Sequence, residues 1–270
     1  MSGLSASIAS VGVFGPGWAN WAACRASLRG DAPVPELEPV DAYPPPTGLP
    51  KNERRRTSPI TRISFAACED ALAQRPEFER SGIRSVFASC SGDMDIVDDI
   101  CRALTREPIA LSPTQFHNSV HNASAGYWSI ANHARVASTS LSGYDASFAA
   151  GLVEAVLQLD EDPEQPVLLV AFDVATRPPL SLARAVPVPF ATALLLTRDR
   201  VGSLGQLRLD PAAPLSESEL QGTLETVRTA NPAARALPLL DRVAREVSGE
   251  VVTPMPSGKW GLNMTYTPVS

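Results

Sequence analysis

The sequence predicts an α/β protein built in layers, and three stretches of the chain indicate this class. Residues 166–175 (PVLLVAFDVA) and 190–199 (FATALLLTRD) are apolar runs without alternation, which is typical of strands covered on both faces. Residues 144–159 (YDASFAAGLVEAVLQL) are apolar nearly all the way around a helix. We therefore expect this helix to be buried between layers rather than to lie on a surface.

The N-terminal part is expected to alternate between strand and helix. Residues 4–13 mix small and apolar side chains and then meet the turn GVFGPG, which predicts a strand. Helical spacing over residues 18–28 predicts a helix that Gly30 ends. A proline-rich loop is expected over residues 32–50.

The middle of the chain continues this alternation. A basic turn, NERRRT, precedes a helix expected to begin near Pro59, then a strand over 84–90 and a helix over 93–105. A small-residue helix is expected over 120–132. The inward side chains of the first of these helices are expected to be Ile63, Ala66, Ala67 and Ala71.

The region after residue 200 predicts an edge strand over 205–210, a polar helix over 216–229, an amphipathic helix over 236–248 and a final strand over 258–268. Its apolar side chains are numerous enough to form a partial lid over the helix at 144–159. These side chains are Leu237, Leu239, Leu240, Val243, Trp260, Leu262, Met264 and Tyr266.

Composition excludes several classes of function. A net charge of −6 argues against a nucleic-acid or anionic-membrane partner. The start of the chain has no basic segment typical of a signal peptide, and the longest apolar stretch, 185–196, is short and holds two prolines. We therefore expect a cytoplasmic protein without a membrane span. The four cysteines lack CxxC spacing, which favours reduced thiols over disulfides or zinc ligands: Cys24, Cys68, Cys90 and Cys101.

Six segments, taken in order, resemble the N-terminal half of β-ketoacyl synthases. They are the GVFGPG turn, ERRRTSPITRISFAACEDAL, VFASCSGDM, SPTQFHNSVHNASAGYWSIA, ASTSLSGYDASFAAGLVEAVL and PVLLVAFDVA. The resemblance spans about residues 5–200. It implies a thiolase-like fold, here one layered α/β/α half, with residues 1–200 as the synthase-like N-terminal domain. Residues 201–270 are expected to be a reduced C-terminal extension packing on the same core.

Two departures from that family bear on catalysis. A strand is expected over residues 135–139. In such synthases the corresponding strand ends on an A-C-[ST]-S or A-C-[ST]-S-G type motif, whose cysteine accepts the acyl group. The sequence TSLSG at 139–143 puts Ser140 at the cysteine position. A serine hydroxyl is far less acidic than a thiol and needs an adjacent general base to attack a thioester.

The second departure concerns histidine. Condensing synthases use two histidines from their C-terminal half, whereas His117, His121 and His133 all precede Ser140 here. Residues 201–270 are too few to supply that half. The sequence therefore predicts no catalytic residue and no cofactor.

A shortened homologue of this kind resembles the chain-length-factor-like subunits of aryl polyene pathways. Such subunits pair with a full-length β-ketoacyl synthase, work on chains held by an acyl carrier protein, and line one end of the acyl tunnel. The resemblance implies a heterodimer in fatty acid or polyketide chain elongation, joined across a two-fold axis by residues 134–139, with 113–121 near the tunnel. The expected tunnel and interface residues are Phe116, His117, Val120, His121, Val136, Ala137, Ser138 and Thr139.

Other interpretations of these residues stay open. Ser140 could be the nucleophile of an independent serine acyltransferase or thioesterase, although TSLSG is not the G-x-S-x-G elbow. Alternatively, Ser140 and Ser142 cap a helix that begins near Tyr144. A self-associating scaffold protein without acyl binding is a third class.

Two further clusters have a functional and a plain interpretation. His117 and His121 are four residues apart, as in a zinc pair on a helix, but residue 118 is Asn and no third ligand is near in sequence. No metal site is therefore predicted. Arg54, Arg55 and Arg56 suit the acidic surface of a carrier protein, or form a solvated basic turn.

Overall fold

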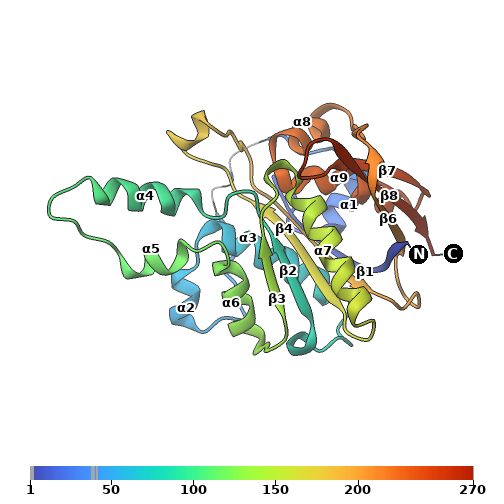
Figure 1. Ribbon diagram of the computed structural model, residues 1–270, viewed down its shortest axis with the longest axis horizontal. Coiled ribbons are helices and arrows are strands. Elements are labelled where there is room, and N and C mark those ends of the chain that lie inside the picture. The colour runs from blue at the N-terminus through green and yellow to red at the C-terminus, as the bar shows by residue number, and fades with distance from the viewer. Residues whose placement is uncertain (1–2, 38–39, 41, 270) are drawn as a thin grey trace.

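One mixed sheet runs through the molecule, in the strand order β3-β2-β4-β5-β1-β6-β8-β7 (Figure 1). The computed structural model describes residues 3–37, 40 and 42–269. Strands β2, β3 and β4 are mutually parallel, and the other pairs are antiparallel. The strands are β1 (Leu4–Phe14), β2 (Arg84–Ala88), β3 (Ser138–Leu141), β4 (Val167–Asp173), β5 (Phe190–Thr197), β6 (Gly205–Pro214), β7 (Gly249–Pro254) and β8 (Trp260–Pro268).

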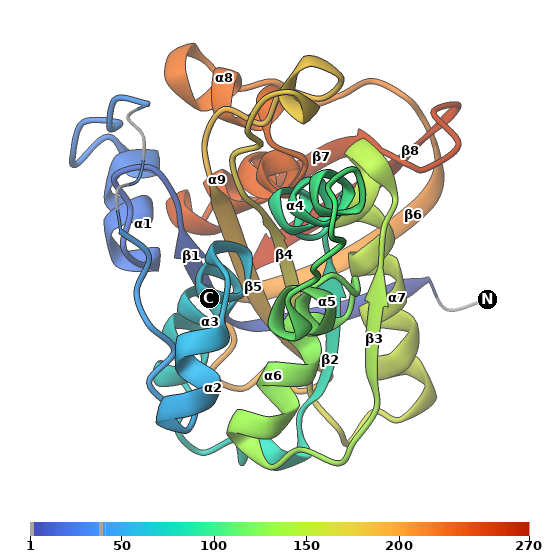
Figure 2. The ribbon, with the colours of Figure 1, turned by 90° about the vertical axis from the view of Figure 1, so that its left-hand side faces the viewer.

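Helices cover both faces of this sheet. In Figures 1 and 2, α3 and α6 lie on one face, and α1, α7 and α9 lie on the other. The α-helices are α1 (Trp21–Arg29), α2 (Lys51–Arg56), α3 (Pro59–Ala73), α4 (Met94–Leu104), α5 (Pro113–Asn118), α6 (Ala123–Asn132), α7 (Ser147–Glu161), α8 (Gly222–Ala230) and α9 (Leu237–Arg245). Short 3₁₀ turns are η1 (Arg80–Gly82), η2 (Tyr144–Ala146), η3 (Leu180–Leu182) and η4 (Pro232–Ala236).

The central strands are buried on both faces, which confirms the predicted layered α/β class. In β4, Leu168 and Val170 pack in the core beneath α3 and α6. Leu169 and Ala171 pack in the core beneath α7. Side chains alternate between the faces of a strand, so an unbroken apolar run feeds both cores at once.

Helix α7 is buried largely as the sequence predicted. Phe148, Leu152 and Val156 lie in the core against the sheet, with η4 packed nearby. The helix begins at Ser147 rather than at Tyr144, because Tyr144 has a left-handed backbone (φ 56°) and a 3₁₀ turn follows.

The C-terminal region extends the same sheet. Strand β6 was expected at the edge, which is wrong: it lies between β1 and β8, and β7 is the edge strand at that end. Strands from residues 1–200 and from residues 201–270 share one sheet. The division of the chain into a synthase-like domain and a C-terminal extension at residue 200 stays a prediction. Of the eight expected lid side chains, all but Trp260 are buried, and Trp260 is 53% exposed.

Several boundaries differ from those predicted. The basic turn before α3 is the short helix α2, and Ala66 in α3 is half-buried rather than buried. Strand β3 begins at Ser138, three residues later than predicted. Helix α5 and strand β7 were not predicted.

In the described part of the chain, no helix combines the length and the apolar character needed to cross a bilayer.

Candidate functional site

The carboxyl ends of the parallel strands β2, β3 and β4 meet at one edge of the sheet, the end toward α4 in Figure 1. Polar groups gather there because each strand passes into a turn at this edge. Cys90 follows β2, Ser142 follows β3, and Asp173 is the last residue of β4. Edges of this kind commonly hold ligands in α/β proteins.

Ser140 lies within β3, opposite Phe87 of β2. Its Oγ is buried and has no hydrogen-bond partner among the described residues. Ser140 borders an open groove of about 460 Å³ together with His121, and small residues of α6 form much of the wall. The His121 Nε2 lies 3.1 Å from the carbonyl oxygen of Ser89. Within the described structure, no general base lies within hydrogen-bond distance of Ser140.

The capping interpretation of the two serines is wrong. The Ser142 hydroxyl donates to the carbonyl oxygen of Cys90 at 2.6 Å, and so ties the turn after β3 to the turn after β2. The cap-like contact comes instead from Ser147, whose Oγ accepts from the Gly143 N–H at 3.1 Å.

Cys90 is a thiol at the carboxyl edge of the sheet that the sequence did not single out. It is buried, and the Ser91 hydroxyl donates to its sulfur at 3.3 Å. Burial raises the pKa of the Cys90 thiol, with Asp173 adding to the shift. A thiol held in its neutral form is a poor nucleophile.

Asp173 is the most perturbed carboxyl group of this edge. One carboxylate oxygen accepts hydrogen bonds from the Ser89 hydroxyl and the Cys90 N–H, both at 2.9 Å. The other oxygen is buried and unpartnered among the described residues. Burial is the main cause that raises the pKa of Asp173 to about 7, and the Ser89 hydrogen bond opposes it. The only sequence signal was a single acid closing an apolar run.

Asn231, from the C-terminal region, contacts the same end of the sheet. Its side-chain amide donates to the carbonyl oxygens of Asp173 at 3.1 Å and Val188 at 2.9 Å. Arg184 closes the other side, where it pairs with Asp145 and stacks on the Tyr144 ring, 3.9 Å from the ring centroid.

The histidines do not form a helical pair. Helix α5 ends at Asn118, so His117 is on the helix and His121 lies in the turn beyond it. His117 is exposed and meets Tyr127 edge-to-face. Among the described residues, no group of three or more His, Cys, Asp or Glu side chains is placed to hold a metal ion.

The residues predicted for an interface lie on two features. One is β3, an edge strand of the sheet, with Ser138 and Ser140 toward α6 and Thr139 toward Gln158 of α7. The other is the segment 113–121, where Phe116 is 66% exposed and Val120 is 52% exposed. Val136 and Ala137 precede β3 rather than belonging to it.

The three arginines of α2 differ in their contacts. Arg54 donates to the carbonyl oxygens of Thr47 and Leu49, each at 3.0 Å, and so braces the preceding turn. Arg56 pairs with Glu53 at 3.3 Å. Arg55 is exposed and, within the described structure, makes no ion pair.

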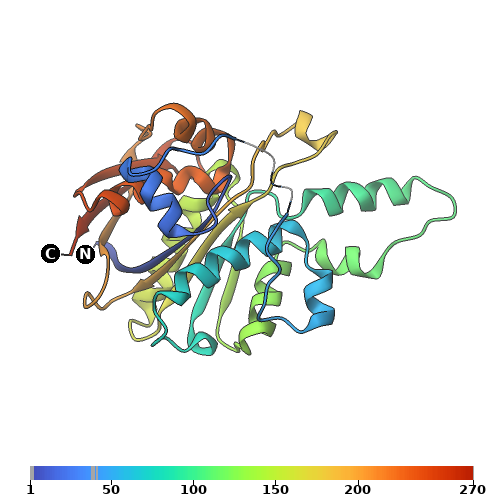
Figure 3. The same ribbon diagram turned by 180° about the vertical axis from the view of Figure 1, so that it is seen from behind.

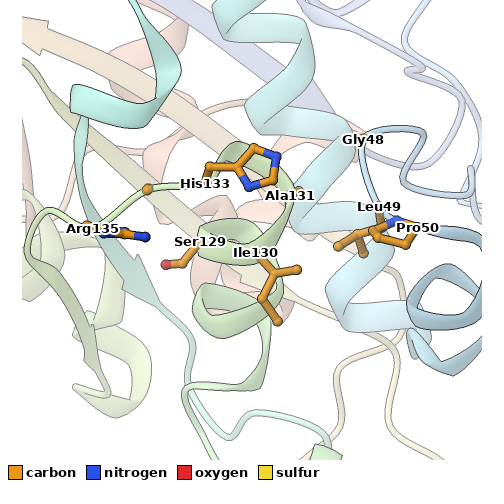
Figure 4. A pocket seen from close by; sticks show the side chains of 9 residues that line it. Gly48, Leu49, Pro50, Ser129, Ile130, Ala131, His133 and Arg135 are labelled. Carbon is orange, nitrogen blue, oxygen red and sulfur yellow. The ribbon is translucent and has the colours of Figure 1, made fainter.

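A second groove, of about 710 Å³, lies at the other end of α6 (Figure 4). It runs between the turn at 48–50 and the last turn of α6, where His133 has a left-handed backbone. Neither Ser140 nor the segment 113–121 borders it.

Comparison with known proteins gives a family and a set of similar folds. A family model described as "Beta-ketoacyl synthase, N-terminal domain" matches residues 18–261. A comparison with curated proteins found no significant match.

Three solved structures illustrate the likeness of fold. A chain of the ketosynthase (ApeO) in complex with its chain length factor (ApeC) from Xenorhabdus doucetiae is 23% identical, with a TM-score of 0.71 over 98% of this chain and 99% of that chain. The ishigamide ketosynthase/chain length factor gives 11% identity and a TM-score of 0.74 over 98% and 100% of the two chains. The complex AntDE:AntF, a type II PKS acyl-carrier protein with its ketosynthase, gives 12% identity and a TM-score of 0.75 over 99% of this chain and 100% of that chain.

The raised pKa of Asp173 predicts how stability depends on pH. The folded protein holds this proton more tightly than the unfolded chain, whose carboxyl group keeps the ordinary value of 3.8. The contribution is therefore fully present below pH 4 and is lost as pH rises through 7. Between pH 4 and 8 the wild type should lose about 2–4 kcal/mol of unfolding free energy relative to Asp173→Asn.

Urea unfolding of both proteins at a series of pH values measures this difference. The variant keeps the size and acceptor oxygen of the side chain but does not titrate. Parallel pH profiles for the two proteins would contradict the prediction.

Proposed function

Because the chain belongs to the β-ketoacyl synthase N-terminal-domain family, we propose that it is a chain-length-factor-like subunit without catalytic activity of its own. It pairs with a full-length β-ketoacyl synthase in the cytoplasm and works in chain elongation of the aryl polyene type, on chains held by an acyl carrier protein. The observation that supports this most directly is Ser140. It stands where the family has a nucleophile, yet its hydroxyl is buried, and in the described structure no base is in reach.

The free edge of β3 is the proposed pairing surface. The carbonyls of Ala137 and Leu141 accept from β2. Peptide groups alternate in direction along a strand, so the N–H groups of Ser138 and Ser140 point to the open side. An edge strand with unpaired backbone groups tends to find a partner strand. A synthase strand running antiparallel to β3 would satisfy these groups and continue the sheet.

The segment 113–121 is the proposed contribution to the acyl tunnel. Phe116 and Val120 are large apolar side chains that the chain itself leaves exposed. Burial against a partner would remove this surface from water and place a bulky wall beside the two-fold axis. His117 and His121 are assigned to the same surface, together with Val136 and Ala137 at the entry to β3.

The carrier-protein contact proposed for α2 rests mainly on Arg55. Arg54 and Arg56 are already engaged within the chain, so their guanidinium groups offer less to an acidic partner. An independent serine enzyme remains the alternative function, but the surroundings of Ser140 do not favour it.

The first prediction of the proposed function concerns catalysis. Incubated with acyl carrier protein carrying an acyl or malonyl group, the purified protein should form no covalent adduct and release no carbon dioxide. No adduct is expected because neither Ser140 nor Cys90 is activated as a nucleophile. No carbon dioxide is expected because the two histidines that the resemblance assigns to decarboxylation are missing, since all three histidines precede Ser140. Intact-mass spectrometry detects an acyl adduct directly, and the catalytic synthase serves as the positive control. An adduct that disappears in Ser140→Ala would instead support the serine enzyme.

The second prediction concerns pairing. Ser138→Pro removes one backbone donor from the open edge of β3 and should weaken binding to the synthase at least tenfold, or about 1.4 kcal/mol. Ser216→Pro, in an exposed loop near the other end of the sheet, is the control and should bind as the wild type does. Size-exclusion chromatography with light scattering and titration calorimetry measure the complex. Equal affinity of both variants would remove β3 from the interface.

The third prediction concerns product length. A bulky side chain at the tunnel end limits extension, because steric overlap costs about 1–3 kcal/mol and exceeds what dispersion returns. Phe116→Ala in the reconstituted pair should therefore lengthen or broaden the products without abolishing condensation. Mass spectrometry of the products gives the distribution, and Val201→Ala, on a distant exposed loop, is the matched control. An unchanged distribution would mean that the tunnel is bounded elsewhere.

A further inference from the structure

Residues 94–118 form an arm that projects away from the sheet and its helix layers. Figures 1 and 3 show α4 and α5 side by side, joined by a loop at the far end. Within the chain, α4 packs mainly against α5, and the Gln115 side chain donates to Asp99 at 3.2 Å. The arm as a whole extends well beyond the segment 113–121.

Helix α4 buries none of its side chains, although it is strongly amphipathic. Ile96, Ile100 and Leu104 recur every four residues and form one apolar stripe. Ile96 and Ile100 are half-buried, Leu104 is 52% exposed, and Ile109 in the loop beyond the helix is 60% exposed. Burying such side chains is what normally stabilises a helix in a protein.

Few contacts fasten α4 to the body of the molecule. Asp93 caps α4 by accepting from the Ile96 N–H at 3.1 Å. Arg177, from the loop after β4, pairs with Asp95 at 2.7 Å, and both contacts are at the base of the helix. An isolated helix shorter than about 12–15 residues is marginal in water, and α4 has 11 residues.

Charge indicates what kind of surface would cover the stripe. Residues 94–112 contain four carboxylates and two guanidiniums: Asp95, Asp98, Asp99 and Glu107 against Arg102 and Arg106. Asp95 is paired with Arg177 and Asp98 with Arg102, so Asp99 and Glu107 are the two that make no ion pair among the described residues. A complementary surface is an apolar groove with a basic rim.

We propose that α4 and the loop 105–112 are the partner-dependent part of this arm, which becomes stably folded only when its apolar stripe seats in such a groove on the catalytic synthase. This rests on the proposed function and adds a contact separate from both β3 and Phe116. Residues 94–112 are next in sequence to the segment 113–121, so one partner reaches both.

Hydrogen exchange tests the state of the arm without any assumption about activity. In the isolated chain, amides of residues 94–112 should exchange much faster than those of α3 and α7. Adding the synthase should slow them about tenfold or more. Protection of the arm in the isolated monomer equal to that of α7 would overturn the proposal.

Charged substitutions on the stripe and in the loop beyond it test the contact itself. Leu104→Asp and Ile109→Asp should each weaken binding to the synthase about tenfold or more, and leave the thermal unfolding of the isolated chain unchanged. Val201→Asp, at a site 80% exposed elsewhere on the chain, is the control and should bind as the wild type does.

The outcomes separate the two proposals. Failure of the wild type to bind the synthase would contradict the proposed function. Binding of the wild type together with equal binding of both arm variants would overturn the arm alone.

Discussion

Burial of both faces of the sheet is the constraint on which this fold depends. The central strands β4, β5 and β1 supply apolar side chains to two cores at once, so each face needs a complete helix layer. On one face α3 and α6 provide it. On the other, α7 alone is too narrow, and α1, η4 and α9 complete the cover. The C-terminal region is therefore part of what makes the sheet stable, through both its helices and its three added strands.

The same constraint shapes the edge where a catalytic site would lie. The turns after β2, β3 and β4 are tied to one another by the Ser142–Cys90 and Asp173–Ser89 hydrogen bonds. These bonds hold polar groups in fixed positions, but none of them activates a hydroxyl or a thiol. The result is a rigid carboxyl end of the sheet, held by hydrogen bonds between its turns.

Much of the fold could be predicted because its signals are local. Consecutive apolar residues indicated β4 and β5, and a continuous helical pattern indicated α7. The place of β6 could not be predicted, since its pairing with β8 joins residues about sixty positions apart. Helix α2 was missed because KNERRR is polar throughout and has no apolar periodicity. For the site, the sequence placed Ser140 just after a strand expected over 135–139, whereas it lies within β3. The importance of Asp173 could not be predicted, because its raised pKa arises from burial that only the folded chain creates.

The amide of Asn231 shows how the rest of the fold depends on the C-terminal region. It satisfies two buried carbonyl oxygens at the ends of segments far away in sequence, and each bond is worth about 1 kcal/mol. A gene truncated after residue 200 would leave both acceptors, and the apolar faces around them, open to water. Residues 201–270 are therefore needed to satisfy these carbonyl oxygens and to cover the apolar face around α7 in the part of the chain that precedes them.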